Sequence, residues 1–179
     1  MSRIGRAPIA LPAGVTFDNT DNLITVKGPL GTLTQKVDPS IEVVLEDGHI
    51  LVKRHSDDKD HRALHGLYRA LIHNMVTGVT KGFEKNLIVA GVGYKVTATP
   101  NKLTLNIGFS HAIDFDAPEG ITFAMAGPLE IVVKGIDRQK VGQAAASIKA
   151  LKPVEPYHGY GIHYKDEVVI RKEGKTAGK

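Results

Sequence analysis

The chain has 179 residues, of which 42% are hydrophobic and 23% are charged, a balance typical of globular proteins that argues against global disorder. The absence of cysteine excludes disulfides, thiol catalysis and cysteine-based zinc sites. No apolar run approaches transmembrane length and the first residues lack the apolar segment of a secretory signal, so we expect a cytoplasmic protein that does not associate with membranes.

The net charge of +4 is unevenly distributed. Residues 1–82 carry 10 basic and 9 acidic side chains, and residues 83–148 carry 6 of each. Residues 149–179 carry 7 basic and 4 acidic side chains, a net charge of +3. A polyanionic partner is therefore expected to bind near the C-terminal end.

The two halves of the chain resemble each other. A shift of 80 positions aligns Leu23–Val26 with Leu103–Asn106 and places Gly28 on Gly108. Each half then continues with an acidic start signal and a helical pattern. We infer two tandem copies of one small α+β unit.

Alternation of apolar and polar residues between turn signals predicts five strands in each half. In the first half they span about 14–18, 22–27, 31–37, 41–46 and 49–54. In the second half they span about 86–99, 102–108, 111–116, 121–125 and 129–134.

One helix is predicted in each half, at about 60–76 and 138–151, and the first is expected to end where residues 77–82 bring in two glycines. The apolar face of the first helix consists of Leu64, Leu67, Tyr68, Leu71, Ile72 and Met75. Its opposite face carries Arg62, His65, Arg69 and His73. The inward face of the second helix consists of Val141, Ala144, Ala145, Ile148 and Leu151. Each helix should pack on one face of an antiparallel-rich sheet.

The expected organisation is a first α+β repeat over residues 1–82 and a second over residues 83–152. An RNA-binding loop and basic tail follow over residues 153–179.

Three motifs resemble catalytic or cofactor sites without meeting their requirements. His61 and His65 have helical metal-ligand spacing, but Arg62 stands where a zinc protease needs glutamate. Gly174-Lys-Thr176 lacks the leading glycine and the following helix of a phosphate-binding loop, and Gly91-Val-Gly93 lacks the third glycine of a dinucleotide fingerprint. We expect no catalytic residues, metal, cofactor or small-molecule substrate.

The stretch from Lys152 to Lys165 is the best candidate for function. Pro153 ends the preceding helix, and Gly159 and Gly161 permit backbone conformations that side chains would block. Around them lie three tyrosines, two histidines and a lysine: Tyr157, Tyr160, Tyr164, His158, His163 and Lys165. Rings, cations and bare backbone suit RNA phosphates and unstacked bases. The alternative is an ordinary turn whose tyrosines cover the edge of a core.

Several blocks, in order, resemble bacterial-type large-ribosomal-subunit protein six, a universal ribosomal protein family. The first are Met1-Ser-Arg-Ile-Gly-Arg-Ala-Pro-Ile-Ala-Leu-Pro-Ala-Gly14 and Val26-Lys-Gly-Pro-Leu-Gly31. The later ones are His61-Arg-Ala-Leu-His-Gly66, Gly91-Val-Gly-Tyr-Lys95, Ile107-Gly-Phe-Ser-His111 and Gly135-Ile-Asp137. The most specific is Glu155-Pro-Tyr-His-Gly-Tyr-Gly-Ile162.

The resemblance implies a non-catalytic protein of the large ribosomal subunit, with large-subunit rRNA and neighbouring ribosomal proteins as partners. It implies that rRNA binds mainly to the second domain and the tail, near the region where translation factors act. The contacts carried over by resemblance are Lys152, Tyr157, His158, Gly159, Gly161, Lys165, Arg171 and Lys172, with a further contact at the turn of Gly108, Ser110 and His111. The pattern of rings and charges adds Tyr160, His163, Tyr164 and Lys175.

The chain departs from the family at three of these positions. The family often has lysine at His158 and Tyr160, and arginine or lysine at His163. Histidine is mostly uncharged near neutral pH unless a phosphate raises its pKa. Stacking by Tyr160 is expected to replace part of the lost electrostatic contribution.

Two other functions stay open at the level of sequence. The first is a free-standing RNA-binding module that acts as a regulator or chaperone. The second is an enzyme whose site lies between the two halves, although that would need a titratable cluster that the sequence does not contain.

Overall fold

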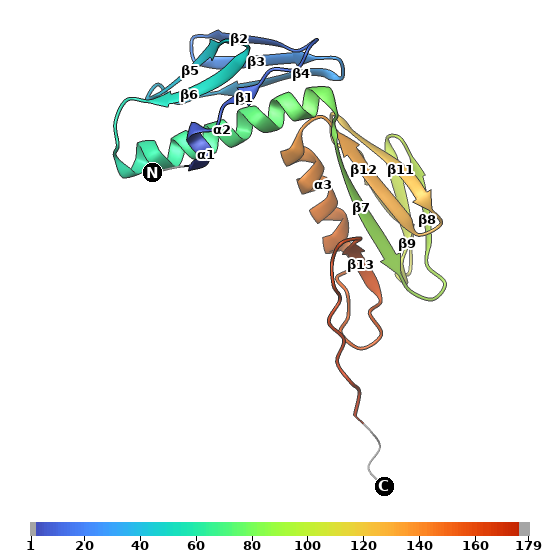
Figure 1. Cartoon of the computed structure of the whole chain (residues 1–179). Helices are drawn as coiled ribbons and strands as arrows, with labels where there is room; N and C mark the ends of the chain where they lie inside the picture. Colours follow the sequence, from blue (N-terminus) through green and yellow to red (C-terminus); the bar gives the residue numbers. More distant parts are fainter. Residues whose placement is uncertain (1–2, 176–179) are drawn as a thin grey trace. The chain divides into compact units, whose positions relative to one another are not determined.

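A computed structural model describes residues 3–175 of the chain (Figure 1). The chain forms two compact units. The first contains the residues up to Gly82 together with Ile136–Arg138, and the second contains Phe83–Gly135 and the residues from Gln139 onward.

The first unit packs a long helix, α2, against two antiparallel sheets. Its elements are α1 (Arg3–Arg6), β1 (Ile9–Ala10), β2 (Thr16–Thr20), β3 (Leu23–Gly28), β4 (Gly31–Lys36), β5 (Ile41–Glu46), β6 (His49–Arg54) and α2 (Lys59–Thr80). The strand orders are β2-β3-β4 and β1-β6-β5. Alternate residues of β3, among them Ile24 and Val26, are fully buried in a core that includes Ile72 and Val79 of α2.

The second unit has the same plan. Its elements are β7 (Phe83–Ala90), β8 (Lys95–Thr99), β9 (Lys102–Asn106), β10 (Ile113–Asp116), β11 (Ile121–Gly127), β12 (Glu130–Gly135), α3 (Arg138–Leu151) and β13 (Gly161–Tyr164). The strand orders are β10-β9-β8 and β11-β12-β7-β13, all antiparallel. Of the five residues predicted to face inward on α3, Val141, Ala144, Ala145 and Ile148 are buried in one core with Leu87 and Ile131, and Leu151 is partly buried against that core.

The predicted fold class is confirmed: two α+β units follow each other, each with antiparallel sheets and one long helix. The structure adds that the strands of each unit divide into two sheets.

The predicted strand at 86–99 is wrong, because two strands, β7 and β8, are separated by a turn at residues 91–94. Gly91 lies against the Tyr94 ring so closely that a Cβ there would collide with it. Gly93 has φ +74°, which no strand residue adopts. The alternation of apolar residues continues on both sides of the turn, so the sequence pattern predicted one uninterrupted strand.

Two details of the first helix also differ from the prediction. The helix continues through Gly78 to Thr80, because the neighbouring strand packs directly on it: a Cβ at Gly28 would lie 2.7 Å from the side chain of Val79. His65 is buried with 3% of its surface exposed, whereas Leu67 is 50% exposed. The imidazole of His65 satisfies its polar atoms inside the unit, which permits burial of a residue that the pattern placed outside.

The sequence pattern also missed strand β13, which adds to the edge of β7 with Ile162 opposite Val89. Ile162 is fully buried in the core of the second unit. The segment from residue 153 onward therefore contributes to the core as well as to the surface.

Candidate nucleic-acid interface

Three loops meet at one end of the second unit. Strand β7 ends at Ala90, β9 ends at Asn106 and α3 ends at Leu151. The antiparallel register places Asn106 opposite Lys95 and Ala90 opposite Gly161. The loops at residues 91–94, 107–112 and 152–160 consequently share this end (Figure 1). We call it the loop end.

Side chains connect these loops to one another. The Tyr94 ring lies beside both Gly91 and Gly108, which joins the first two loops. The Lys152 ammonium, at the end of α3, lies 4.8 Å from the centre of the Phe109 ring. The structure therefore brings the predicted turn at residues 108–111 together with Lys152, although more than forty positions separate them in the chain.

Glu155 organises the third loop. Its carboxylate accepts hydrogen bonds from the backbone N–H groups of His158 (2.6 Å), Tyr157 (3.2 Å) and Tyr160 (3.5 Å), and its own N–H donates to the Tyr160 carbonyl (3.0 Å). Burial favours a higher pKa for Glu155, but the three N–H groups and the nearby His158 together hold the pKa below its ordinary value. The loop is thus closed around a charged acceptor.

The rings of this loop project outward. Tyr157 is 55% exposed and Tyr160 is 36% exposed. The rings of His158 and Tyr160 stack with centroids 5.3 Å apart and an interplanar angle of 18°. Stacked, exposed rings beside a cation form a surface on which an unpaired base can lie.

Gly159 and Gly161 are both buried and both have positive φ, +76° and +143°. A Cβ at Gly159 would lie 3.0 Å from the guanidinium of Arg171. A Cβ at Gly161 would lie 2.7 Å from the carbonyl oxygen of Pro153 and 2.7 Å from Cα of Val154. These glycines shape the loop from within, and the neighbouring side chains form its surface.

The basic tail returns to the same loop. The backbone N–H of Lys172 donates to the carbonyl of Pro156 at 2.7 Å, and the Arg171 side chain lies over Gly159. Two cations of the tail are therefore held at the loop end. Lys175 is exposed and is the last residue that the structure describes.

The remaining predicted residues lie on or just after β13 and interact within the unit. The Tyr164 ring has the ammonium groups of Lys149 and Lys85 at 4.8 and 5.4 Å from its centre. Lys165 forms an ion pair with Glu130 at 2.6 Å. The half-buried His163 donates through Nδ1 to the Tyr164 carbonyl at 2.9 Å.

Elsewhere at the loop end, Ser110 and His111 are exposed, with Oγ and Nδ1 3.3 Å apart. Phe109, which is 42% exposed, lies inside the predicted turn but was not named as a contact, and Val92, which is 82% exposed, was not predicted. Phe109 lies between the predicted contacts Gly108 and Ser110, and this position could have identified it as a further contact. Val92 falls within the strand predicted at 86–99, so the sequence pattern did not place it in an exposed loop.

The described residues contain no group of three or more His, Cys, Asp or Glu side chains that could hold a metal ion. His61 Nδ1 lies 2.7 Å from the Ser56 hydroxyl, whereas His65 is buried against the Val52 carbonyl, so this pair does not converge. No helix within residues 3–175 is long and apolar enough to cross a membrane. Thr176, the last residue of the Gly174-Lys-Thr motif, lies outside the described residues.

Comparison with known proteins identifies the family. The family model described as ribosomal protein L6 matches residues 11–82 and 90–165, one segment in each unit. The chain belongs to the ribosomal protein L6 family. It is 53% identical over its full length to all of the large ribosomal subunit protein uL6 of Syntrophomonas wolfei. It is 51% identical, again over the whole of both chains, to the protein of the same name from Clostridium beijerinckii.

Membership of the ribosomal protein L6 family makes this chain a structural protein of the large ribosomal subunit and not an enzyme. The enzyme suggested as one alternative is therefore set aside. A free-standing RNA-binding module has no support from these relatives, which are named as ribosomal proteins along their entire length.

Proposed function

We propose that this protein binds large-subunit rRNA mainly through the loop end of its second unit and through its C-terminal tail, near the region where translation factors act. Other large-subunit proteins are its neighbours, in ribosomes of the cytoplasm. In this division, residues 1–82 form the first domain, residues 83–152 the second, and residues 153–179 the RNA-binding segment. The supporting observation is that three loops and the returning tail place cations and exposed rings at one end.

The chemistry of the loop end suits a folded RNA. Lys152, Arg171 and Lys172 supply positive charge for phosphates, and Arg171 adds a planar guanidinium. Tyr157 and Tyr160 offer exposed rings for stacking. The one carboxylate inside the loop, on Glu155, already accepts three backbone N–H groups, so its charge is partly compensated.

A salt titration of binding to a large-subunit rRNA fragment tests the proposal. Lys152→Gln and Lys172→Gln should each lower the slope of log affinity against log salt by about 0.7–0.9, the effect of one lost phosphate contact. Lys140→Gln is the matched control, because Lys140 is an exposed lysine in the first turn of α3, at the opposite end of that helix. Equal slopes for the control and the two loop-end variants would contradict the proposal.

The rings should behave differently from the cations. Stacking is less sensitive to salt, so Tyr157→Ala should weaken binding by a similar factor at low and high salt, by about 1–3 kcal/mol if one base stacks there. Tyr164→Phe is the control, because the Tyr164 ring is already flanked by two lysines of its own unit. An unchanged affinity for Tyr157→Ala would remove Tyr157 from the interface.

A further inference from the structure

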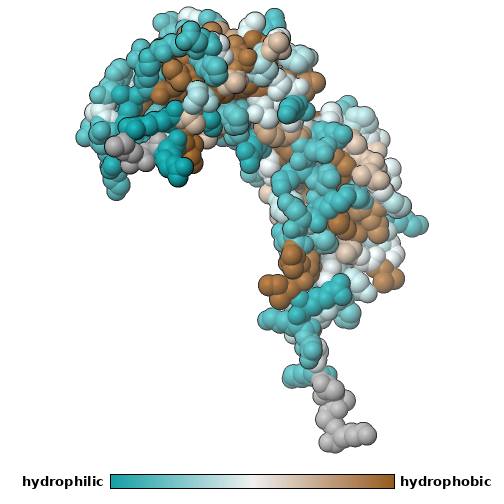
Figure 2. All heavy atoms as spheres, viewed as in Figure 1, coloured by the Kyte–Doolittle hydropathy of each residue, from teal (hydrophilic) through white to brown (hydrophobic). Residues whose placement is uncertain are grey.

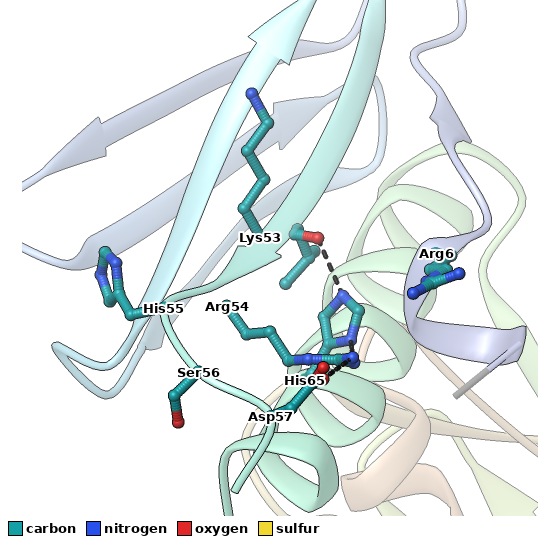
Figure 3. A pocket seen from close by; sticks show the side chains of 8 residues that line it. Arg6, Lys53, Arg54, His55, Ser56, Asp57 and His65 are labelled. Carbon is teal, nitrogen blue, oxygen red and sulfur yellow. Dashed lines mark hydrogen bonds and ion pairs between the residues drawn. The ribbon is translucent and has the colours of Figure 1, made fainter. Parts of the chain in front are cut away.

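The first unit contains a basic pocket that the loop end does not explain. Its volume is about 530 Å³, and it is lined by residues at the end of β6, the following turn, α1 and α2 (Figure 3). Three lining residues, Arg6, Lys53 and Arg54, are cations, and one, Asp57, is an anion, which gives a lining charge of 3 − 1 = +2. Lys53 forms an ion pair with Glu46 and Arg54 forms one with Asp57, so Arg6 is the lining cation without an ion pair among the described residues.

Arg54 is held in place from both sides. Its side chain is 10% exposed, and it donates through one terminal nitrogen to Nδ1 of His65 at 3.1 Å and through the other to Asp57. His65 Nε2 lies 2.9 Å from the Val52 carbonyl, which can only accept, so Nε2 carries the proton and Nδ1 is the acceptor for Arg54. His65 thus acts as a positioning residue for the guanidinium.

This arrangement leaves donors unused. A guanidinium has five N–H groups, and the described residues provide acceptors for two of those on Arg54. The other three N–H groups have no acceptor among the described residues, and Arg54 is one of the residues that line the pocket. Hydrogen bonds from a guanidinium to an anion are charge-assisted and therefore strong, so these N–H groups suit an anionic ligand.

Arg6 adds a second cation from another element. Helix α1 rests on His65 so closely that a Cβ at Gly5 would collide with the imidazole. The chain after α1 is fixed by Arg69, which donates to the carbonyls of Ala7 (3.1 Å) and Pro8 (3.3 Å). Arg6 is exposed and forms no ion pair with any described residue.

We propose that this pocket binds a phosphate group, with Arg6 and Arg54 as its ligands. A carboxylate, Asp57, already occupies one terminal nitrogen of Arg54, so the free donors lie on different atoms and on two separate guanidiniums. A tetrahedral anion, whose oxygens point in several directions, suits such donors better than a second planar carboxylate. The phosphate is either part of an RNA backbone or a free ion.

The test uses the full-length protein labelled with ¹⁵N and titrated with inorganic phosphate at constant ionic strength. We expect saturable shifts of the Arg54 Nε–H and His65 Nε2–H signals. Arg6→Gln should weaken binding roughly three- to tenfold, as for one partly exposed charge-assisted hydrogen bond. The control Lys36→Gln removes an exposed lysine of the same unit that does not line the pocket, and it should leave binding unchanged.

A second arm separates the sources of phosphate. If RNA supplies it, Arg6→Gln should also lower the salt slope of binding to a large-subunit rRNA fragment by about 0.7–0.9. If the slope stays constant while phosphate affinity falls, the site takes a free phosphate. Non-saturating shifts, equal affinity for wild type and Arg6→Gln, or stronger binding of an acidic peptide than of phosphate would overturn the proposal.

This inference stands apart from the proposed function, because the pocket belongs to the first unit and the loop end to the second. Lys152→Gln should leave the phosphate titration unchanged, and Arg6→Gln should leave the effect of Lys152→Gln on RNA binding in place. Failure of either proposal is therefore visible separately.

Discussion

Gly161→Ala is expected to destabilise the second unit strongly, because the fold leaves no room for a side chain there. Gly161 has φ +143°, a conformation that costs an L-residue about 1–3 kcal/mol. Its Cβ would also lie 2.7 Å from two backbone atoms of residues 153 and 154. Those atoms cannot rotate away as a flexible side chain would.

The collision adds to the strain. The backbone that must move is held by the hydrogen bond from the N–H of Ile162 to the carbonyl of Lys152 at 2.8 Å. Overpacking of this kind costs about a further 1–3 kcal/mol. For a unit of this size each kcal/mol lowers the melting temperature by about 4–8 °C. The melting temperature should therefore fall by roughly 10 °C or more.

Gly120→Ala is the matched control. Gly120 belongs to the same unit and has φ +81°, but nothing lies within 4 Å of its Cβ position. Gly120→Ala therefore introduces backbone strain but no steric collision. The difference between the two variants measures the close contact between β13 and the chain after α3.

Near-ultraviolet circular dichroism of the tyrosines is a suitable assay, because a chain of two units need not unfold in one transition. Four of the five tyrosines belong to the second unit, so their signal reports mainly on it. The explanation would be refuted if Gly161→Ala melted together with Gly120→Ala. It would also be refuted if Gly161→Ala lost RNA affinity with no loss of stability, which would make Gly161 an RNA contact and not a packing site.

Two further predictions concern carboxylates of the second unit. Glu155→Gln should lower RNA affinity although it removes a negative charge from a basic surface, because the Glu155 carboxylate organises the loop. The control Glu173→Gln removes an exposed carboxylate of the tail and should raise RNA affinity. If both variants bound RNA more tightly in the same assay, net charge alone would determine the affinity. The hydrogen bond from Lys149 holds the pKa of Glu167 below its ordinary value. The Glu167 carboxylate therefore stabilises the fold above the unfolded pKa of about 4.3, and this stabilisation is lost as the pH falls through the lower folded pKa. Denaturant unfolding between pH 6 and 3 should show a shallower loss for Glu167→Gln, and parallel curves would contradict this.

Periodicity predicted most of the fold because most elements of this chain are locally determined. Strands β3, β4 and β6 of the first unit alternate between inward and outward residues, and both long helices carry an apolar stripe. Figure 2 shows hydrophilic side chains alongside scattered hydrophobic ones on the visible surface, so surface hydropathy alone does not mark where a partner binds. The repeat of element order then fixed the tandem plan.

The misplaced features depend on contacts between distant residues. Residues 91–94 turn because Gly91 and Gly108 leave space for the Tyr94 ring, a contact between two loops. His65 is buried because Val52 and Arg54, from a neighbouring strand, satisfy its two nitrogens. Helical periodicity describes one element at a time and contains no information on such partners.

The candidate interface shows the same limit at the level of single side chains. Tyr157, Tyr160 and Tyr164 belong to one stretch. The residue type alone does not distinguish a tyrosine that stacks on a base from one that packs beside a lysine. Pairing of Tyr164 with Leu87 on β7 places it in the sheet, whereas the Glu155 carboxylate holds the loop that carries the other two. The sequence therefore marked residues 152–165 as the candidate stretch, but only pairing with a strand more than seventy positions away separates its outward rings from its inward one.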